Sequence, residues 1–291
     1  MLIDPGPQER AVRTLFVSDV HIGCRYAQPE RFLAYLQQVR PEQIFILGDF
    51  LDGWKLQSTW RWKPVYTQIV KRLVQLAQDG AELFYTPGNH DAFLRCADVR
   101  YLVESTGVNV QVQDEFVFRA ADGRRFLVTH GDKFDVIEMR YQWLSIAASF
   151  VYEPMMFFDH WASRLFGREG YSPYSRCVLI KGKVKSAIRF LSHFEQTLFR
   201  HARSLGCDGV ICGHIHTPGL TTVDEVTYFN TGDWVENCTA LVEHYDGSLR
   251  LESAYPAGFP AVVSPRVRSV PWEREHPLPA ATSKRHVAEP A

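Results

Sequence analysis

The stretch TLFVSDVH, residues 14–21, decides the fold of this chain. Its apolar half has the length and composition of a buried strand, and an aspartate and a histidine follow it at once. Four further apolar runs, at residues 44–47, 82–86, 126–129 and 209–212, are likewise followed by polar or glycine residues. Segments with helical apolar spacing lie between the first three runs, at 29–39 and 66–78. This alternation predicts βαβ units, and hence an α/β fold with mixed sheets.

A short polar motif follows each predicted strand. The carboxyl ends of strands in an open α/β sheet meet at one crevice, so we expect the five motifs to form one site. Each motif taken singly is most often only a turn. All five in this order indicate a functional site. In chain order they are Asp19-Val20-His21, Gly48-Asp49, Gly88-Asn89-His90-Asp91, His130-Gly131-Asp132 and Gly213-His214-Ile215-His216.

The residue types in these motifs suit a pair of metal ions. Hydrolysis of a phosphate ester at neutral pH needs a strong nucleophile and neutralisation of charge on the phosphoryl group. Two divalent ions about 3.5–4 Å apart supply both. Alternate side chains of an extended segment share one side, which predicts that Asp19 and His21 reach one ion. The same reasoning joins His214 and His216.

Two further residues complete this expectation, and a third has two interpretations. Asp49 follows a strand and a glycine that allows close approach of the backbone, so it is the expected bridge between the ions. Asn89 offers a neutral oxygen ligand. His90 either caps a loop or takes part in catalysis, and its place between Asn89 and Asp91 favours catalysis.

Composition restricts the class of partner and the compartment. The chain has 32 Lys and Arg against 33 Asp and Glu, so its net charge of −1 gives no overall attraction for nucleic acid. The six cysteines are scattered singly, which is typical of a reducing cytoplasm rather than of a disulfide framework. We expect no secretory signal and no transmembrane helix, because no apolar run reaches roughly 18 residues.

The chain divides into a domain, an insertion and a tail. We expect the domain at residues 10–255, closing with strands at 239–243 and 248–252. Residues 133–206 have helical periodicity and no strand signal, which predicts an inserted helical lid. Residues 256–291 hold seven of the sixteen prolines and are expected to be disordered.

The predicted lid is rich in both apolar and basic residues. It carries eleven basic residues against six acidic ones, so positive charge is concentrated where an anionic ligand could be covered. Its aromatic residues either pack within the lid or contact lipid. Its basic residues either form a solvated face or bind substrate phosphate, and the candidates for phosphate binding are Lys181, Lys183, Lys185 and Arg189.

The ordered motifs resemble those of the calcineurin-like metallophosphoesterase superfamily. The resemblance covers residues 19–216 and implies a four-layer αββα core with two divalent metal ions, Mn²⁺, Fe or Zn. It also implies that His90 is the catalytic residue that protonates the leaving oxygen, with Asp91 orienting its ring. The implied ligands are Asp19, His21, Asp49 and His216 for one ion, and Asp49, Asn89, His130 and His214 for the other.

Further residues are similar to the UDP-2,3-diacylglucosamine diphosphatase group of lipid A synthesis. They are the stretch 48–54, which ends in Trp54, the long insertion after residue 132, and Gly232-Asp233-Trp234. The resemblance implies a Mn²⁺ enzyme that releases UMP and a diacylglucosamine 1-phosphate from a nucleotide-linked glycolipid. Trp54 becomes a candidate substrate contact. One departure is His90, where enzymes of that group usually carry Arg.

The leading hypothesis is therefore a cytoplasmic hydrolase that contacts the inner face of the membrane peripherally through its lid. An alternative with the same chemistry is a soluble phosphodiesterase or phosphatase that acts on nucleotides or other small phosphoesters. A third possibility is a non-catalytic, metal-bound scaffold for partner proteins. That possibility predicts the loss of one or more ligands, and none of the expected ligands is missing from the sequence.

Overall fold

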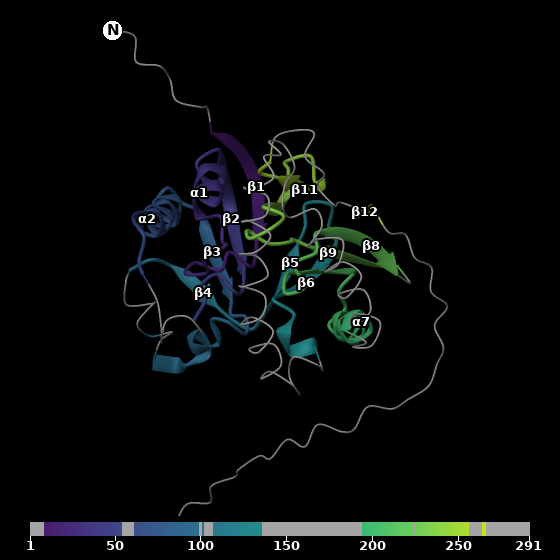
Figure 1. The fold of residues 1–291 in the computed structure, drawn as a ribbon. Coiled ribbons are helices and arrows are strands. Elements are labelled where there is room, and N and C mark those ends of the chain that lie inside the picture. Colours follow the sequence, from purple (N-terminus) through teal and green to yellow (C-terminus); the bar gives the residue numbers. More distant parts are fainter. Residues whose placement is uncertain are drawn as a thin grey trace, which may run out of the picture.

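Two six-stranded mixed sheets form the centre of the molecule (Figure 1). The computed structural model describes residues 9–53, 61–98, 101, 107–135, 194–223, 225–255 and 264–265. Within these residues the α/β class and the mixed sheets predicted from the sequence are confirmed.

The first sheet has a parallel centre, in which β1, β2, β3 and β4 run in the same direction. An antiparallel pair of strands from the end of the domain extends it beyond β1. In spatial order its strands are β11 (Leu249–Ser253), β10 (Thr239–Glu243), β1 (Arg10–Val17), β2 (Val39–Leu47), β3 (Glu82–Thr86) and β4 (Val110–Val112).

The second sheet also has a parallel centre, formed by β6, β7 and β9. Antiparallel strands flank this centre, with β5 on one side and β8 on the other. In spatial order its strands are β12 (Ser264–Pro265), β8 (Gly219–Val223), β9 (Val226–Asn230), β7 (Gly209–Cys212), β6 (Arg125–Thr129) and β5 (Glu115–Arg119).

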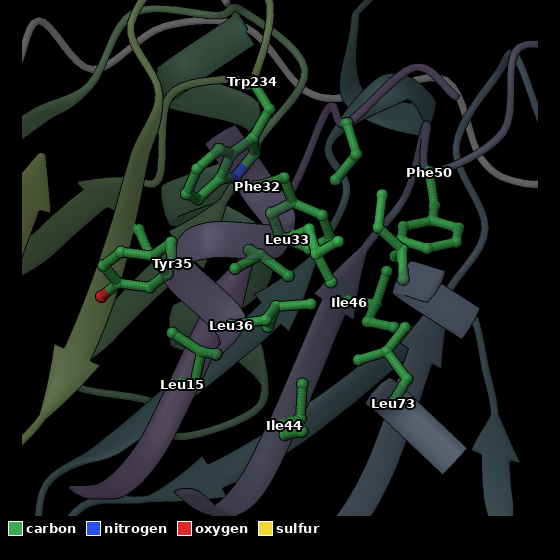
Figure 2. Packing of buried hydrophobic residues seen from close by; sticks show 14 of the residues in the cluster. Leu15, Phe32, Leu33, Tyr35, Leu36, Ile44, Ile46, Phe50, Leu73 and Trp234 are labelled. Atoms are coloured by element: carbon green, nitrogen blue, oxygen red, sulfur yellow. The ribbon is translucent and has the colours of Figure 1, made fainter. Parts of the chain in front are cut away.

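Three apolar cores hold the layers together. Phenylalanines from both sheets meet between them, and Phe16 of β1 contacts Phe118 of β5 edge-on with ring centroids 5.0 Å apart. Helices α1 (Pro29–Leu36) and α2 (Pro64–Gln78) cover the outer face of the first sheet (Figure 2). Helix α7 (Phe194–Ser204) covers the outer face of the second sheet (Figure 1). The predicted αββα layering is confirmed.

The boundaries of β3, β7 and β10 agree with the expectation, whereas β1 and β2 begin four and five residues earlier than expected. The predicted helix at 29–39 ends at Leu36, because residue 39 already begins β2. Of the predicted lid, residues 136–193 lie outside the described residues, whereas η2 (Asp132–Phe134) and α7 mark its two ends. Of the predicted tail, only β12 is described. None of the described helices is both long and apolar enough to cross a membrane.

Candidate metal centre

The five motifs converge because they follow neighbouring strand ends in two packed sheets. Strands β1, β2 and β3 of the first sheet lead into the motifs at 19–21, 48–49 and 88–91. Strands β6 and β7 of the second sheet lead into those at 130–132 and 213–216. Backbone hydrogen bonds join these loops, including His21 N to Asp49 O (2.8 Å) and Gly213 N to His130 O (3.1 Å). The site therefore spans the edges of both sheets.

The backbone at the predicted ligands is left-handed, not extended. Among the described residues, seven non-glycine residues have positive φ, and five of them are predicted ligands. Such backbone costs of order 1 kcal/mol or more per residue and is concentrated at functional sites. The extended geometry expected for residues 19–21 and 214–216 is therefore wrong, although Val20 does point into the core. The five are Asp19 (φ 53°), His21 (49°), Asp49 (51°), His214 (69°) and His216 (50°).

Glycines let the motif loops pack directly on one another. A Cβ atom added to Gly48 would lie 2.6 Å from the His130 ring and 2.7 Å from the backbone nitrogen of Gly88. One added to Gly88 would overlap a carboxylate oxygen of Asp49. The close backbone approach expected before Asp49 is thus present, and it depends on the absence of side chains at these two positions.

One half of the site consists of Asp19, His21 and His216. The Nε2 atom of His216 lies 3.1 Å from Asp19 Oδ1 and 3.3 Å from the Nε2 atom of His21. All three offer a ligand atom within 4.8 Å of the others. Asp19 and His21 are buried and His216 is half-buried. These residues can hold a divalent ion.

Asp49 lies between this group and the other half of the site. Its Oδ2 atom is 3.9 Å from His21 Nε2 on one side and 3.5 Å from His130 Nε2 on the other. The Nδ1 atom of His130 lies 2.7 Å from the carbonyl oxygen of Leu47 and donates to it, so its Nε2 lone pair faces the site. Asn89 Oδ1 is 3.3 Å from that Nε2 atom. The Asp49 carboxylate therefore lies between an imidazole of each half of the site.

His214 lies beside the cluster and forms none of its closest ligand groups. Its backbone N–H donates to Asp19 Oδ2 at 3.0 Å, and its ring centroid is 5.2 Å from that of His130. Its Nε2 atom is 3.3 Å from Asp135 Oδ2. Among the described residues, the groups of three close ligands include Asp19, His21, Asp49, His90, His130 and His216. The ligand role of His214 stays a prediction.

One ring nitrogen of His90 faces the cluster, and the other faces a carboxylate. Its Nε2 atom is 4.0 Å from Asp49 Oδ2, and its Nδ1 atom is 3.1 Å from Asp52 Oδ1. Asp91 was expected to orient this ring. Instead, its carboxylate accepts hydrogen bonds from the Tyr85 hydroxyl and from the backbone N–H groups of residues 50, 51 and 88. Asp52 takes the orienting position, and Asp91 holds the loops around it.

The carboxylates and imidazoles change each other's protonation. Burial opposes ionisation of Asp49, but the neighbouring His130 and His90 hold its pKa well below the usual range. Burial likewise opposes the charged form of Asp19, and His216 still lowers the pKa of that carboxyl. In the opposite sense, the carboxylates of Asp19 and Asp49 outweigh burial and raise the pKa of His21 to about 9. The cluster therefore has a strong affinity for positive charge.

The donor set fits a divalent metal ion. Asp19 Oδ1 is buried and has no hydrogen-bond partner, although His216 Nε2 is only 3.1 Å away. A buried carboxylate oxygen without a donor is costly unless a cation satisfies it. The two imidazole Nε2 atoms that face each other at 3.3 Å also suit a shared cation better than a direct hydrogen bond.

Several supporting residues carried no assigned role in the sequence analysis. Asp52 had a signal, because the stretch Gly48-Asp49-Phe50-Leu51-Asp52 contains a second carboxylate three residues after the first. Asp135 and the ion pair of Asp132 with Arg95 (2.9 Å) had no such signal. The predicted substrate contacts Trp54, Lys181, Lys183, Lys185 and Arg189 lie outside the described residues.

Comparison with known proteins gives a family match and a set of relatives. The family model described as calcineurin-like phosphoesterase matches residues 12–218. A protein named UDP-2,3-diacylglucosamine hydrolase from Vibrio cholerae serotype O1 is 27% identical over 252 residues, covering 79% of this chain and 94% of its own. One of the same name from Xanthomonas campestris pv. campestris is 26% identical over 265 residues, covering 82% and 98%. A solved archaeal phosphodiesterase is 15% identical, covers 82% of this chain and 98% of its own, and has a TM-score of 0.42.

Proposed function

The chain belongs to the calcineurin-like phosphoesterase family, and from this membership we propose that it is a two-metal hydrolase of a nucleotide-linked diphosphate in a lipid precursor. The family match supports phosphoester hydrolysis as the reaction. The observation that carries the two-metal proposal is the position of Asp49, whose Oδ2 atom lies within 3.9 Å of an imidazole nitrogen on each side.

The residues divide into two ligand sets that share Asp49. When bound, the two ions would neutralise charge on the phosphoryl oxygens and lower the pKa of a water molecule. Under the proposal, the first set is Asp19, His21, Asp49 and His216, and the second is Asp49, Asn89, His130 and His214.

The protein's own groups fix the orientation of this set before substrate arrives. His130 donates its Nδ1 proton to Leu47 O, so Nε2 is the nitrogen available for a ligand bond. The Oδ1 atom of Asp49 accepts the backbone N–H of His90 at 2.8 Å, which leaves Oδ2 directed between the two halves. Neither residue has to reorganise during the reaction, and such preorganisation is a large part of catalytic power.

His90 is proposed as the proton donor to the leaving oxygen. Its ring stands edge-on to His21, with centroids 4.6 Å apart, and its Nε2 atom faces the cluster. Asp52 accepts from Nδ1, which keeps the proton of that nitrogen in place and fixes the orientation of the ring. A protonated Nε2 can then donate to an oxygen that develops negative charge.

The proposed substrate is UDP-2,3-diacylglucosamine, with UMP and diacylglucosamine 1-phosphate as products. Two relatives that align over most of the chain carry the name UDP-2,3-diacylglucosamine hydrolase, which supports this choice. A cytoplasmic location with peripheral membrane contact belongs to the same proposal. Purified protein with Mn²⁺ should release UMP from this substrate. No turnover, or release of inorganic phosphate alone, would exclude it.

A second candidate is a hydrolase of soluble nucleotides or small phosphoesters. It is favoured by His90, because the group that the sequence resembles usually carries Arg there, and by an identity of only 26–27% to the relatives. The two candidates differ in how much the acyl chains of the substrate contribute to its turnover. A lipid enzyme should have a far higher kcat/KM for UDP-2,3-diacylglucosamine than for UDP-N-acetylglucosamine, whereas equal values would favour the second candidate.

A further inference from the structure

The loop at residues 232–237 connects β9 to β10 and lies beyond the region that the family model matches. We propose that this loop is a clamp on the first metal ion's ligands, with Asp233 and Asn237 as positioning residues for His216. The inference rests on the proposed function, in which His216 is a ligand.

Asp233 is a buried carboxylate whose two oxygens have separate tasks. Its Oδ1 atom accepts the backbone N–H groups of Val235 (2.8 Å), Glu236 and Asn237 (3.1 Å). These bonds close the loop into a tight turn and fix the rotamer of the carboxylate. Its Oδ2 atom is then directed at His216 Nδ1, 3.7 Å away, on the side of the ring opposite to the cluster.

Asn237 joins the carboxylate to the backbone of the ligand. Its Nδ2 atom donates to Asp233 Oδ2 (2.6 Å) and to the carbonyl oxygen of His216 (2.8 Å). His216 has φ of 50°, a left-handed conformation that costs energy and is more stable when its surroundings restrain it. One amide group therefore restrains both the backbone of His216 and the carboxylate that faces its ring.

Trp234 ties the same loop to a second proposed ligand and to the core. Its backbone N–H donates to the carbonyl oxygen of Asp19 at 3.0 Å. Its indole is fully buried against α1, with its ring centroid 4.7 Å from that of Phe32 and 5.4 Å from that of Tyr35 (Figure 2). The loop thus holds Asp19 and His216, which would share one ion, in a fixed position relative to a packed helix.

The arrangement places the Nε2 atom of His216 at 3.1 Å from Asp19 Oδ1 and gives Nδ1 a carboxylate neighbour. Histidine ligands of metal ions nearly always have an acceptor on the second ring nitrogen, which fixes the tautomer and the ring orientation. Loss of such a partner typically lowers metal affinity by about 10- to 100-fold. The clamp should therefore control occupancy of the first ion, although neither residue touches it.

The test compares Mn²⁺ affinity in the wild type and four variants, by titration against a chelator, with the metal content of each measured separately. Asn237→Ala removes both bonds of the amide, and Asp233→Asn replaces Oδ2 or Oδ1 by a donor. The matched control is Gln28→Ala, because Gln28 Nε2 bonds the same loop at Val235 O (3.4 Å) but touches no proposed ligand. His216→Ala reports the loss of the ligand itself.

We expect Asn237→Ala and Asp233→Asn to bind one of the two ions about 10- to 100-fold more weakly. Excess Mn²⁺ should restore the activity of both variants, which it would not do for a general folding defect. Gln28→Ala should bind as the wild type does. The proposed role of the loop is wrong if Asn237→Ala and Asp233→Asn both bind Mn²⁺ with wild-type affinity. It is also wrong if Gln28→Ala weakens Mn²⁺ binding to the same extent. If His216→Ala binds the same number of ions as the wild type with the same affinity, the assignment of His216 as a ligand in the proposed function fails instead.

Discussion

At the scale of single residues, the backbone of the candidate metal-binding motifs has a restrained conformation that the residue types alone do not reveal. Five predicted ligands have positive φ, and hydrogen bonds between loops hold them there. Asp19 N bonds Gly48 O, and His21 N bonds Asp49 O. Strained backbone of this kind persists only where the surrounding structure restrains it. The ligands are therefore preorganised by neighbouring loops and not by their own strands.

Asp49→Asn should test the bridging role. The amide keeps the shape of the side chain but removes the charge, and the ions contribute several kcal/mol to transition-state stabilisation. Hydrolysis should therefore fall by about 10³-fold or more. The fold should be retained, but the melting temperature in the absence of metal should fall, because the variant removes a carboxylate charge that His130 and His90 stabilise. Asp246→Asn, in the exposed turn before β11, is the control. Retained metal-dependent turnover in Asp49→Asn would refute the bridge.

His90→Gln should test the proton donor. General acid catalysis contributes about 10²–10⁴-fold, so a substrate with a poor leaving group should lose activity by this factor. A nitrophenyl ester, whose leaving group needs no proton, should lose much less. Asp52→Asn should show the same dependence on the leaving group with a smaller loss, because Asp52 acts through His90. Equal losses for both substrates in His90→Gln would contradict the assignment.

At this scale the sequence predicted which side chains come together better than it predicted the residues that support them. Asp19, His21, Asp49 and His130 stand in motifs after strands, and the structure brings them together. The partner of His90 was predicted wrongly as Asp91, because sequence proximity does not show which way a buried carboxylate turns. Asp91 is held by Tyr85 and by backbone N–H groups, which leaves Nδ1 of His90 to Asp52. Only tertiary contacts decide such a choice.

At the scale of elements, the short helix η1 (Ala92–Arg95) joins the two sheets at the site. Arg95 donates to the carbonyl oxygens of Pro87 (2.6 Å) and Gly88 (3.1 Å), just before Asn89. The same guanidinium pairs with Asp132, two residues after His130. Because Asn89 follows β3 and His130 follows β6, this one side chain fixes the distance between ligands of different sheets.

Arg95→Met should loosen that connection. The Arg95 side chain is 23% exposed and that of its partner Asp132 is 10% exposed. The loss of stability should therefore lie between the loss for an exposed ion pair and the loss for a buried one. We expect a fall of about 1–3 kcal/mol in the free energy of unfolding, measured by urea denaturation. Arg124→Met is the control, because Arg124 forms an exposed pair with Asp122. It should change stability by less than about 0.5 kcal/mol. Equal effects would contradict the special role of Arg95.

Most of the buried strands were predicted from the sequence, whereas most of the partly covered strands were not. Strands β3, β7 and β10 have the predicted boundaries, because continuous apolar runs on a fully covered sheet are easily recognised. Strands β4, β5 and β8 were missed, and they lie toward the sheet edges, where side chains are only partly covered and the pattern is weak. Strand β9 was missed too, although it is mostly buried and lies between β8 and β7. Pairing such as β8 with β9 follows from the sheet and not from the residues alone.

At the scale of the whole molecule, the layered fold explains why one site draws on residues nearly two hundred positions apart. The inner phenylalanines pack the two sheets face to face, so the loops after β1 and β7 meet at one edge. His214 N therefore reaches Asp19 Oδ2, although 195 residues separate them in the chain. The sequence could predict that the strand ends converge, but the distances depend on this packing.

The most direct test of the two-metal account is metal add-back to chelated protein, scored with diphosphate, diester and monoester substrates while bound Mn²⁺ is measured. We predict no hydrolysis of any substrate without metal, and activity that rises with bound Mn²⁺ and saturates at two ions per chain. Full activity in the presence of chelator, or saturation with a single ion, would contradict the account.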